Sequence, residues 1–281
     1  MLPNSFLAED LPRLAAEAFE LSRHHCGSCR NFHALWPYLR IARISNAVEA
    51  GRPILESLLA DLFEGGHRKI LVAGAADTGV PALIARAGAP YGITMVVLDC
   101  CNTPLELNRH FFKRLSVPIE TMLQDLKELD VAGEFDIVLA HSVLQMITPD
   151  CRKDVLLRLG RALRPKGQLL NLYNTGQRMT GGLLPEYLGN YARWVIDELD
   201  RLRVSLPERR EAFFARLNAY AQERQAREGA FRNADEVDTL MQEAGFRIKH
   251  RSEIETNLAS PMLTFVSKVS RRRYVTIAEP L

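Results

Sequence analysis

The chain has 281 residues, which at about 150 residues per domain corresponds to roughly two domains. It carries 36 Lys and Arg side chains against 34 Asp and Glu, a formal net charge of +2, and 47% of its residues are apolar. These fractions are typical of a soluble globular protein and exclude disordered, collagen-like and coiled-coil classes. The near balance of charge also makes nucleic acid an unlikely partner, because binding through phosphates needs a concentrated basic surface.

No stretch reaches the ~18 consecutive apolar residues that a membrane span needs, and the first residues lack the pattern of a signal peptide. We therefore expect a cytoplasmic protein with no membrane partner. The five cysteines comprise a close pair, Cys26 and Cys29, an adjacent pair, Cys100 and Cys101, and the isolated Cys151. An odd number without an export signal is a poor disulfide framework, so we expect reduced thiols.

Helices are expected before residue 66. Leu7–His25 has apolar residues at spacings of three and four, the pattern of an amphipathic helix. Phe32–Ala50 is a second helix, expected to kink or split at Pro37, and Ile54–Glu64 is a third. We assign residues 1–65 to an N-terminal helical segment that acts as a lid.

From residue 69 short apolar runs alternate with helical stretches, and the runs are typical of strands buried on both faces. The expected strands are Ile70–Gly74, Gly92–Leu98, Ile119–Leu123, Phe135–Ala140 and Gln168–Tyr173, and the expected helices between them are Val80–Ala87, Leu105–Leu115 and Asp150–Leu163. This alternation predicts an α/β fold with a doubly wound, mostly parallel sheet.

A helical insertion interrupts this rhythm at residues 176–230, which we assign to a cap. Within Arg201–Arg232 eight arginines stand against four glutamates, a local charge of +4. A helix at Ala234–Ala244 and strands at Phe246–Ile254 and Met262–Val269 then resume the sheet, and basic residues 271–273 follow. Residues 66–175 and 231–281 are therefore assigned to one core domain.

Candidate binding residues follow the ends of successive strands, where parallel α/β sheets hold their ligands. The loop Gly74–Gly79 is built of small residues, which allow a ligand to approach the backbone before a helix begins. Asp99 ends the second strand and is placed to accept both hydroxyls of a ribose. Gln124, Asp125 and Leu126 follow the third strand, where a carboxylate and a backbone amide can meet an adenine amino group.

Together these residues resemble the class I S-adenosylmethionine-dependent methyltransferases, which have a Rossmann-like fold. Residues 133–144 resemble that family's fourth strand and its loop, residues 163–169 its turn into the fifth strand, and residues 231–246 its last helix and sixth strand. The resemblance spans about residues 69–173 and 231–269. It implies a seven-stranded sheet with an antiparallel last strand, and S-adenosylmethionine as cofactor. The cofactor-binding residues that it implies are Gly74, Ala75, Asp77, Gly79, Asp99, Cys100, Gln124, Asp125, Leu126 and His141.

The first loop departs from the family pattern. Val72 and Ala73 stand where an acidic residue is usual, and Ala75, Ala76 or Asp77 replace loop glycines. Asp77 either supplies the carboxylate for the cofactor's amino group or caps the helix that begins near Val80. A nicotinamide-binding Rossmann enzyme is a competing interpretation, but the G-x-G-x-x-G fingerprint is absent.

Two residues are candidates for catalysis. His141, at the end of the fourth strand, is the best-placed general base, and its alternative role is to line or orient the pocket. Tyr173, at the end of the fifth strand, is placed to hydrogen-bond an acceptor together with Asn174, and a structural role is the alternative.

The predicted reaction is methyl transfer to oxygen, nitrogen or sulfur of a small-molecule acceptor, because the N-terminal helices and the insertion together form a lid. Two alternatives stand beside it: a non-catalytic S-adenosylmethionine-binding or regulatory protein, and a methyltransferase that acts on RNA or protein through the Arg-rich insertion. A homodimer is one candidate assembly.

A cluster of histidine and cysteine residues lies between the first two helices. On a helix, residues 25, 29 and 33 would share a face with residue 26. His25, Cys26, Cys29 and His33 are thus candidate ligands for tetrahedral Zn²⁺. A redox-active pair and plain packing or pocket-lining residues are the alternatives.

Overall fold

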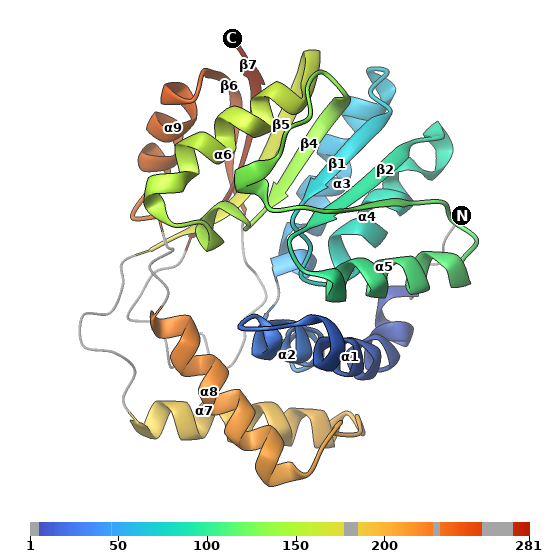
Figure 1. Ribbon diagram of the computed structural model, residues 1–281, viewed down its shortest axis with the longest axis vertical. Coiled ribbons are helices and arrows are strands. Elements are labelled where there is room, and N and C mark those ends of the chain that lie inside the picture. The colour runs from blue at the N-terminus through green and yellow to red at the C-terminus, as the bar shows by residue number, and fades with distance from the viewer. Residues whose placement is uncertain (1–5, 46, 177–184, 227–230, 255–271) are drawn as a thin grey trace.

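A computed structural model describes residues 6–45, 47–176, 185–226, 231–254 and 272–281 of the protein. Its centre is a seven-stranded sheet in the order β3-β2-β1-β4-β5-β7-β6 (Figure 1). The strands are β1 (Lys69–Ala73), β2 (Thr94–Asp99), β3 (Glu120–Leu123), β4 (Phe135–His141), β5 (Leu163–Thr175), β6 (Phe246–Ile254) and β7 (Arg272–Pro280). The first five strands pair in parallel, and β7 pairs antiparallel with both β5 and β6. The predicted fold class is confirmed.

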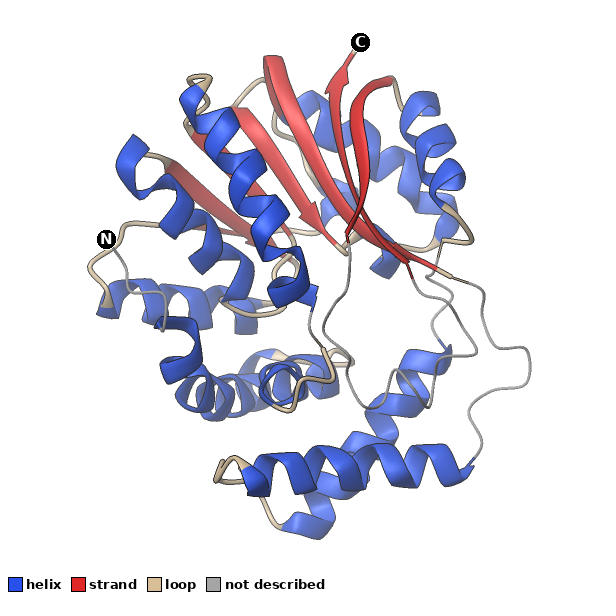
Figure 2. Ribbon diagram, turned by 180° about the vertical axis from the view of Figure 1, so that it is seen from behind, coloured by secondary structure: helices blue, strands red, loops and turns tan. Residues whose placement is uncertain are grey.

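Helices cover both faces of the sheet (Figure 2). They are α1 (Phe6–His25), α2 (Arg30–Ile41), α3 (Ala47–Glu64), α4 (Gly79–Gly88), α5 (Asn102–Arg114), α6 (Pro149–Ala162), α7 (Pro185–Arg201), α8 (Arg210–Ala226) and α9 (Ala234–Glu243). Alternate residues of one strand serve the two faces: Ile70 and Val72 pack with α3, α4 and α5, whereas Leu71 and Ala73 pack with α6 and α9. The strands are therefore apolar on both sides.

A separate helical layer lies beyond the carboxyl ends of the parallel strands (Figure 1). It joins α1 and α2 to α7 and α8 through one apolar cluster in which Leu35, Leu39, Val195, Leu199 and Phe213 are buried. The N-terminal helices and the inserted helices, far apart in the sequence, thus share a core.

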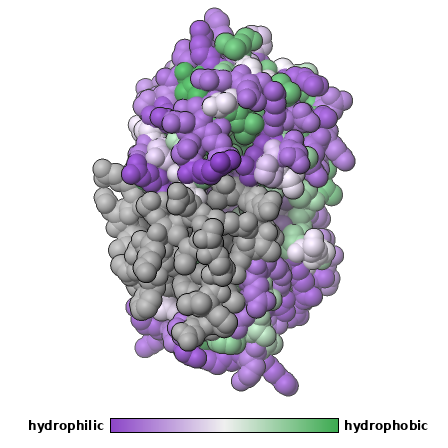
Figure 3. Space-filling model, turned by 90° about the vertical axis from the view of Figure 1, so that its left-hand side faces the viewer, coloured by the Kyte–Doolittle hydropathy of each residue, from purple (hydrophilic) through white to green (hydrophobic). Residues whose placement is uncertain are grey.

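Figure 3 shows one face of the molecule. The described residues on that face are mainly hydrophilic, with scattered apolar residues among them.

The structure differs from the predicted elements at several positions. The predicted strand Met262–Val269 lies outside the described residues, and the described seventh strand is Arg272–Pro280. Pro37 lies within α2, and the expected break comes after it, at the turn where Arg43 has a φ of 57°. β5 begins at Leu163, ahead of the predicted Gln168, with Lys166 at a φ of 67°.

Candidate functional site

The loop between β1 and α4 opens with a glycine that the backbone requires. Gly74 has a φ of +84°, and a Cβ at this position would lie 2.7 Å from Cγ2 of Val143. Its N–H donates to the carbonyl of Leu98 on β2 at 2.8 Å. The chain therefore turns tightly at the end of β1 and brings the N–H of Ala75 to the end of β2.

Asp99 fastens this loop to the end of β2. One carboxylate oxygen accepts from the N–H of Ala75 at 3.0 Å, and the other accepts from the N–H of Cys101 at 2.8 Å. Burial raises the pKa of Asp99, although these two hydrogen bonds and the charge of nearby His33 oppose that rise. Each carboxylate oxygen has two acceptor sites, so each retains one for a ligand.

Asp77 is held by a cation from the helical layer. The guanidinium of Arg40 on α2 lies 2.5 Å from the Asp77 carboxylate and 2.6 Å from Glu49 on α3. The Arg40 side chain is only 1% exposed and that of Asp77 only 5%. Burial lowers the pKa of a guanidinium, but Asp77 and Glu49 outweigh it, so the pKa of Arg40 lies above its usual range. A buried ion pair therefore joins the α2 helix to the β1–α4 loop.

Asp77 and Gly79 are both engaged within the protein. The second oxygen of Asp77 accepts from the N–H of Gly79, the first residue of α4, at 2.8 Å. A Cβ on Gly79 would lie 2.6 Å from a guanidinium nitrogen of Arg40. The close approach of Arg40 is thus a physical reason for glycine at position 79, independent of any ligand.

The segment after β3 lies beside Asp99. The N–H of Gln124 donates to the carbonyl of Asp99 at 3.0 Å, and Leu126 is buried. The Asp125 carboxylate accepts from the N–H of Lys127 at 2.9 Å and so caps a single helical turn. The Cys100 side chain is exposed, but partial desolvation of its thiol raises the pKa of that thiol to about 11.

The two candidate catalytic residues have different surroundings. His141 is the last residue of β4 and is partly buried at the carboxyl edge of the sheet. Tyr173 is fully buried: its ring stacks on Tyr274, and its hydroxyl lies 3.4 Å from Oγ1 of Thr276. Burial raises the pKa of Tyr173 to about 12. The structure thus places Tyr173 in the α6–α9 side of the core, apart from the loop residues.

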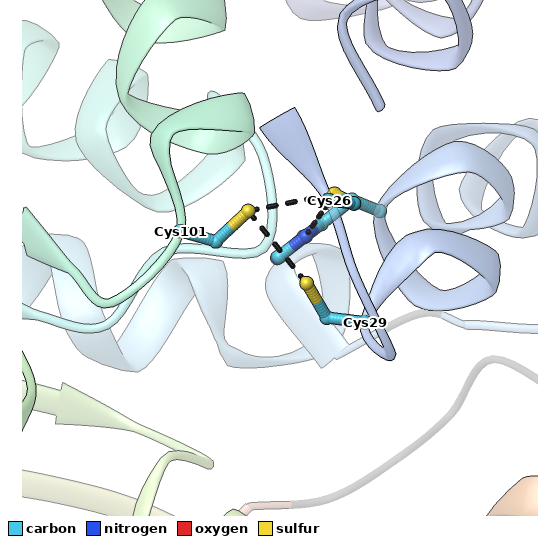
Figure 4. A group of neighbouring side chains, drawn as sticks. Cys26, Cys29 and Cys101 are labelled. Carbon is cyan, nitrogen blue, oxygen red and sulfur yellow. Dashed lines mark hydrogen bonds between the residues drawn. The ribbon is translucent and has the colours of Figure 1, made fainter. Parts of the chain in front are cut away.

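Three thiols and an imidazole meet where the helical layer touches the end of β2 (Figure 4). The Sγ atom of Cys26 lies 3.3 Å from Nδ1 of His33 and 3.4 Å from Sγ of Cys101, and Cys29 lies 3.7 Å from Cys101. His25, a predicted ligand, is exposed and meets this group only through its backbone carbonyl, 3.9 Å from the Cys101 sulfur. Cys101 takes the fourth position in place of the His25 side chain.

The thiols differ in their affinity for protons. Hydrogen bonding to Cys26 lowers the pKa of Cys101, and the same contact raises the pKa of Cys26. Burial lowers the pKa of His33, but hydrogen bonds to Cys101 and Cys29 outweigh it and raise the pKa to about 9. These shifts favour the thiolate form of Cys101 and the protonated form of His33.

Sequence reasoning missed three residues of this region: Arg40, Cys101 as a cluster member, and Arg273. Arg273 on β7 donates to Asn174 at 2.9 Å, beside the end of β5. Burial lowers the pKa of Arg273 to about 10, which the charge of Glu49 opposes. The adjacent cysteines 100 and 101 after a strand end were the one available signal for Cys101, whereas nothing local marks the two arginines.

Residues 70–167 match the family model described as a methyltransferase domain. No curated protein matches the sequence. In residues 6–45, 47–176, 185–226, 231–254 and 272–281, no helix combines the length and apolarity needed to cross a membrane.

Solved structures share the fold at low sequence identity. The mitomycin 7-O-methyltransferase MmcR aligns with a TM-score of 0.53 at 18% identity, over 98% of this chain and 63% of that one. The [4+2]-cyclase SpnF aligns with a TM-score of 0.53 at 12% identity, over 81% of this chain and 80% of that one. The PH0226 protein from Pyrococcus horikoshii OT3 aligns with a TM-score of 0.51 at 16% identity, over 83% of this chain and 89% of that one.

Proposed function

We propose that this chain is a class I S-adenosylmethionine-dependent methyltransferase, since residues 70–167 match a methyltransferase domain, and that it methylates a small-molecule acceptor held beneath α1, α2, α7 and α8. The observation that carries the proposal is the helical layer itself. It lies over the carboxyl ends of the strands and is tied to them at Asp77 and at Cys101. A helical layer over the ligand-binding edge of the sheet suits a small acceptor better than a macromolecule.

The residues around Asp99 fit the adenosine part of the cofactor. Asp99 keeps one acceptor site on each carboxylate oxygen, which matches the two hydroxyls of a ribose. Gly74 and Ala75 would lie along the amino-acid part, while Gln124, Asp125 and Leu126 would meet the adenine and Cys100 would flank the ribose. Asp77 and Gly79 would act indirectly, because Arg40 and the start of α4 already engage them.

Alignment is the main requirement of the reaction. S-adenosylmethionine supplies an electrophilic methyl group on a sulfonium, and transfer needs the acceptor atom in line behind that group. We propose that His141 lies beside the acceptor and takes a proton from it where the acceptor must lose one. Because Tyr173 is buried in the core, we propose for it a packing role rather than a catalytic one.

Charge on the inserted helices supports a small acceptor over RNA. Arg201 pairs with Glu198 at 2.6 Å, Arg210 with Asp200 at 2.5 Å, and Arg216 with Glu208 at 2.7 Å. These arginines are neutralised by neighbours on the same two helices or the turn between them. A surface that binds phosphates through counterion release instead needs unneutralised cations.

Calorimetric titration with S-adenosylmethionine tests the cofactor site. Asp99→Ala removes the charged acceptor of hydrogen bonds that the two ribose hydroxyls would donate, and should weaken binding about 100-fold or more. Asp130→Ala, an exposed aspartate after η2 (Leu126–Glu128), is the matched control and should bind as the wild type does. Equal affinity of the Asp99→Ala variant and the wild type would contradict the assignment.

Methyl-labelled S-adenosylmethionine tests the acceptor class. The protein is incubated with a metabolite extract, with total RNA, or with total protein, each freed of the other two. Label in the small-molecule fraction supports the proposal, and label confined to RNA or protein contradicts it. Binding of the cofactor without label in any fraction would contradict the acceptor assignment while leaving the cofactor site intact.

A further inference from the structure

We propose that Cys26, Cys29, His33 and Cys101 bind one Zn²⁺ ion that fastens the N-terminal helices to the end of β2. The ligand atoms of these four residues all lie within 4.8 Å of one another. Zinc binding at this cluster would be independent of the acceptor and of the cofactor.

The spacing of the four atoms matches a tetrahedral site. Zinc bonds of ~2.3 Å to sulfur and ~2.0 Å to nitrogen place two sulfurs about 3.8 Å apart, and a sulfur and a nitrogen about 3.5 Å apart. The observed sulfur separations are 3.4 Å for Cys26 and Cys101 and 3.7 Å for Cys29 and Cys101. Cys26 Sγ and His33 Nδ1 are 3.3 Å apart. These three separations are each within a few tenths of an ångström of the tetrahedral values, and the remaining pairs lie within 4.8 Å.

Local structure brings the ligands together from two parts of the chain. Cys26 and Cys29 lie in the short link between α1 and α2, and His33 lies in the first turn of α2. Cys101 comes from the junction of β2 and α5, where its N–H is already held by Asp99. Figure 4 shows the three sulfurs pointing toward one another from these two segments.

The surroundings are those of a closed structural site. His33 and Cys101 are each only 5% exposed. The Thr103 hydroxyl lies 3.0 Å from Cys26 Sγ, in the position of an outer hydrogen-bond donor to a metal-bound thiolate. Three thiolates and one imidazole leave no open coordination position, so the ion would stabilise structure rather than carry out chemistry.

A disulfide explains less of this arrangement than a zinc site does. It would join two of the sulfurs and leave the third, together with His33 Nδ1, without a reason for converging on the same point. All five cysteines are free in the structure. Soft thiolate ligands with one imidazole favour zinc over Mg²⁺ or Ca²⁺, which prefer oxygen.

Metal content of the untagged protein, purified under reducing conditions, is the first test. We expect about one zinc per chain. Cys101→Ser should reduce zinc content at least ~10-fold, whereas Cys100→Ser, the exposed neighbour outside the cluster, should retain it. Zinc below about a tenth of an equivalent in the wild type, even after incubation with zinc chloride, overturns the proposal.

A second measurement avoids the variants, which can fail to fold. Wild-type protein is titrated with a thiol-modifying mercurial while a chromogenic chelator reports released zinc. Zinc should be released as the cluster thiols react, and cobalt exchanged into the protein should show the intense visible bands of tetrahedral thiolate coordination. An octahedral cobalt spectrum, or a thiol count lowered by a disulfide between Cys26 and Cys101, overturns the proposal.

Discussion

Replacing Arg40 by methionine should strongly destabilise the protein, because its guanidinium compensates two carboxylates. Arg40 is 1% exposed and contacts Asp77 at 2.5 Å and Glu49 at 2.6 Å. Methionine keeps the length of the side chain and removes its charge. Asp77 is then left as an uncompensated carboxylate in a site that excludes water.

The magnitude follows from the burial of the pair. Removing one partner of a buried ion pair typically costs about 3–5 kcal/mol, against at most about 1 kcal/mol for an exposed pair. For a chain of this size we expect the Arg40→Met variant to unfold roughly 5–10 °C lower. Asp77→Asn retains an acceptor for Gly79 but no charge, so the double variant should be less destabilised than the sum of the two single variants.

Urea unfolding followed by far-UV circular dichroism measures these free energies. Arg201→Met is the matched control, because Arg201 pairs with Glu198 on the exposed face of α7, with the arginine 62% exposed. A change in the free energy of unfolding for Arg40→Met no larger than that for Arg201→Met, about 1 kcal/mol or less, would contradict a stabilising role for the buried ion pair. Simple addition of the effects of Arg40→Met and Asp77→Asn would contradict the coupling between these two residues.

Two further predictions concern stability. Gly79→Ala should lower the free energy of unfolding by about 1–3 kcal/mol, although alanine normally favours a helix, because its Cβ would meet Arg40. Gly27→Ala, with open space around it, should change little, and a neutral Gly79→Ala variant would show that Arg40 moves aside freely. Burial raises the pKa of Asp136, but hydrogen bonds from the N–H groups of Lys69 and Arg68 lower it by more, so its pKa is lowered in the folded protein. It therefore adds stability above its unfolded pKa of about 3.9 that is lost as the pH falls through the lower folded value. The stability deficit of Asp136→Asn should thus be present at neutral pH and shrink in acid, and a deficit independent of pH would contradict this origin.

The sheet could be predicted from sequence because its strands carry their own signal. The runs Ile70–Ala73, Met95–Leu98 and Ile137–Ala140 within β1, β2 and β4 are apolar at every position, and Asp99 stands out because it ends such a run. β7 was missed because Arg272, Arg273 and Glu279 make it more polar than the segment Met262–Val269. Pairing on both sides, with β5 and β6, explains how such a strand is held in the sheet.

The contacts that build the site depend instead on tertiary packing. Cys101 is 75 residues from Cys26, and Arg40 is 37 residues from Asp77. Both pairs form only because the α1–α2 unit docks on the carboxyl edge of the sheet. Spacing along the chain identified Cys26, Cys29 and His33, because they lie close together in the link between α1 and α2 and at the start of α2. It could not show that Cys101, rather than His25, is the fourth member of the cluster.

The position of β7 has a consequence for the order in which the protein folds. β6 has β7 as its neighbour in the sheet, and β7 lies between β6 and β5 although it follows both in the sequence. During synthesis, β6 must wait for residues 272–280 to emerge, while β1 to β5 can already pair. That edge of the domain is therefore assembled only after residue 280 has been synthesised, and until then β5 presents an unpaired edge for a chaperone, or another nascent chain, to meet.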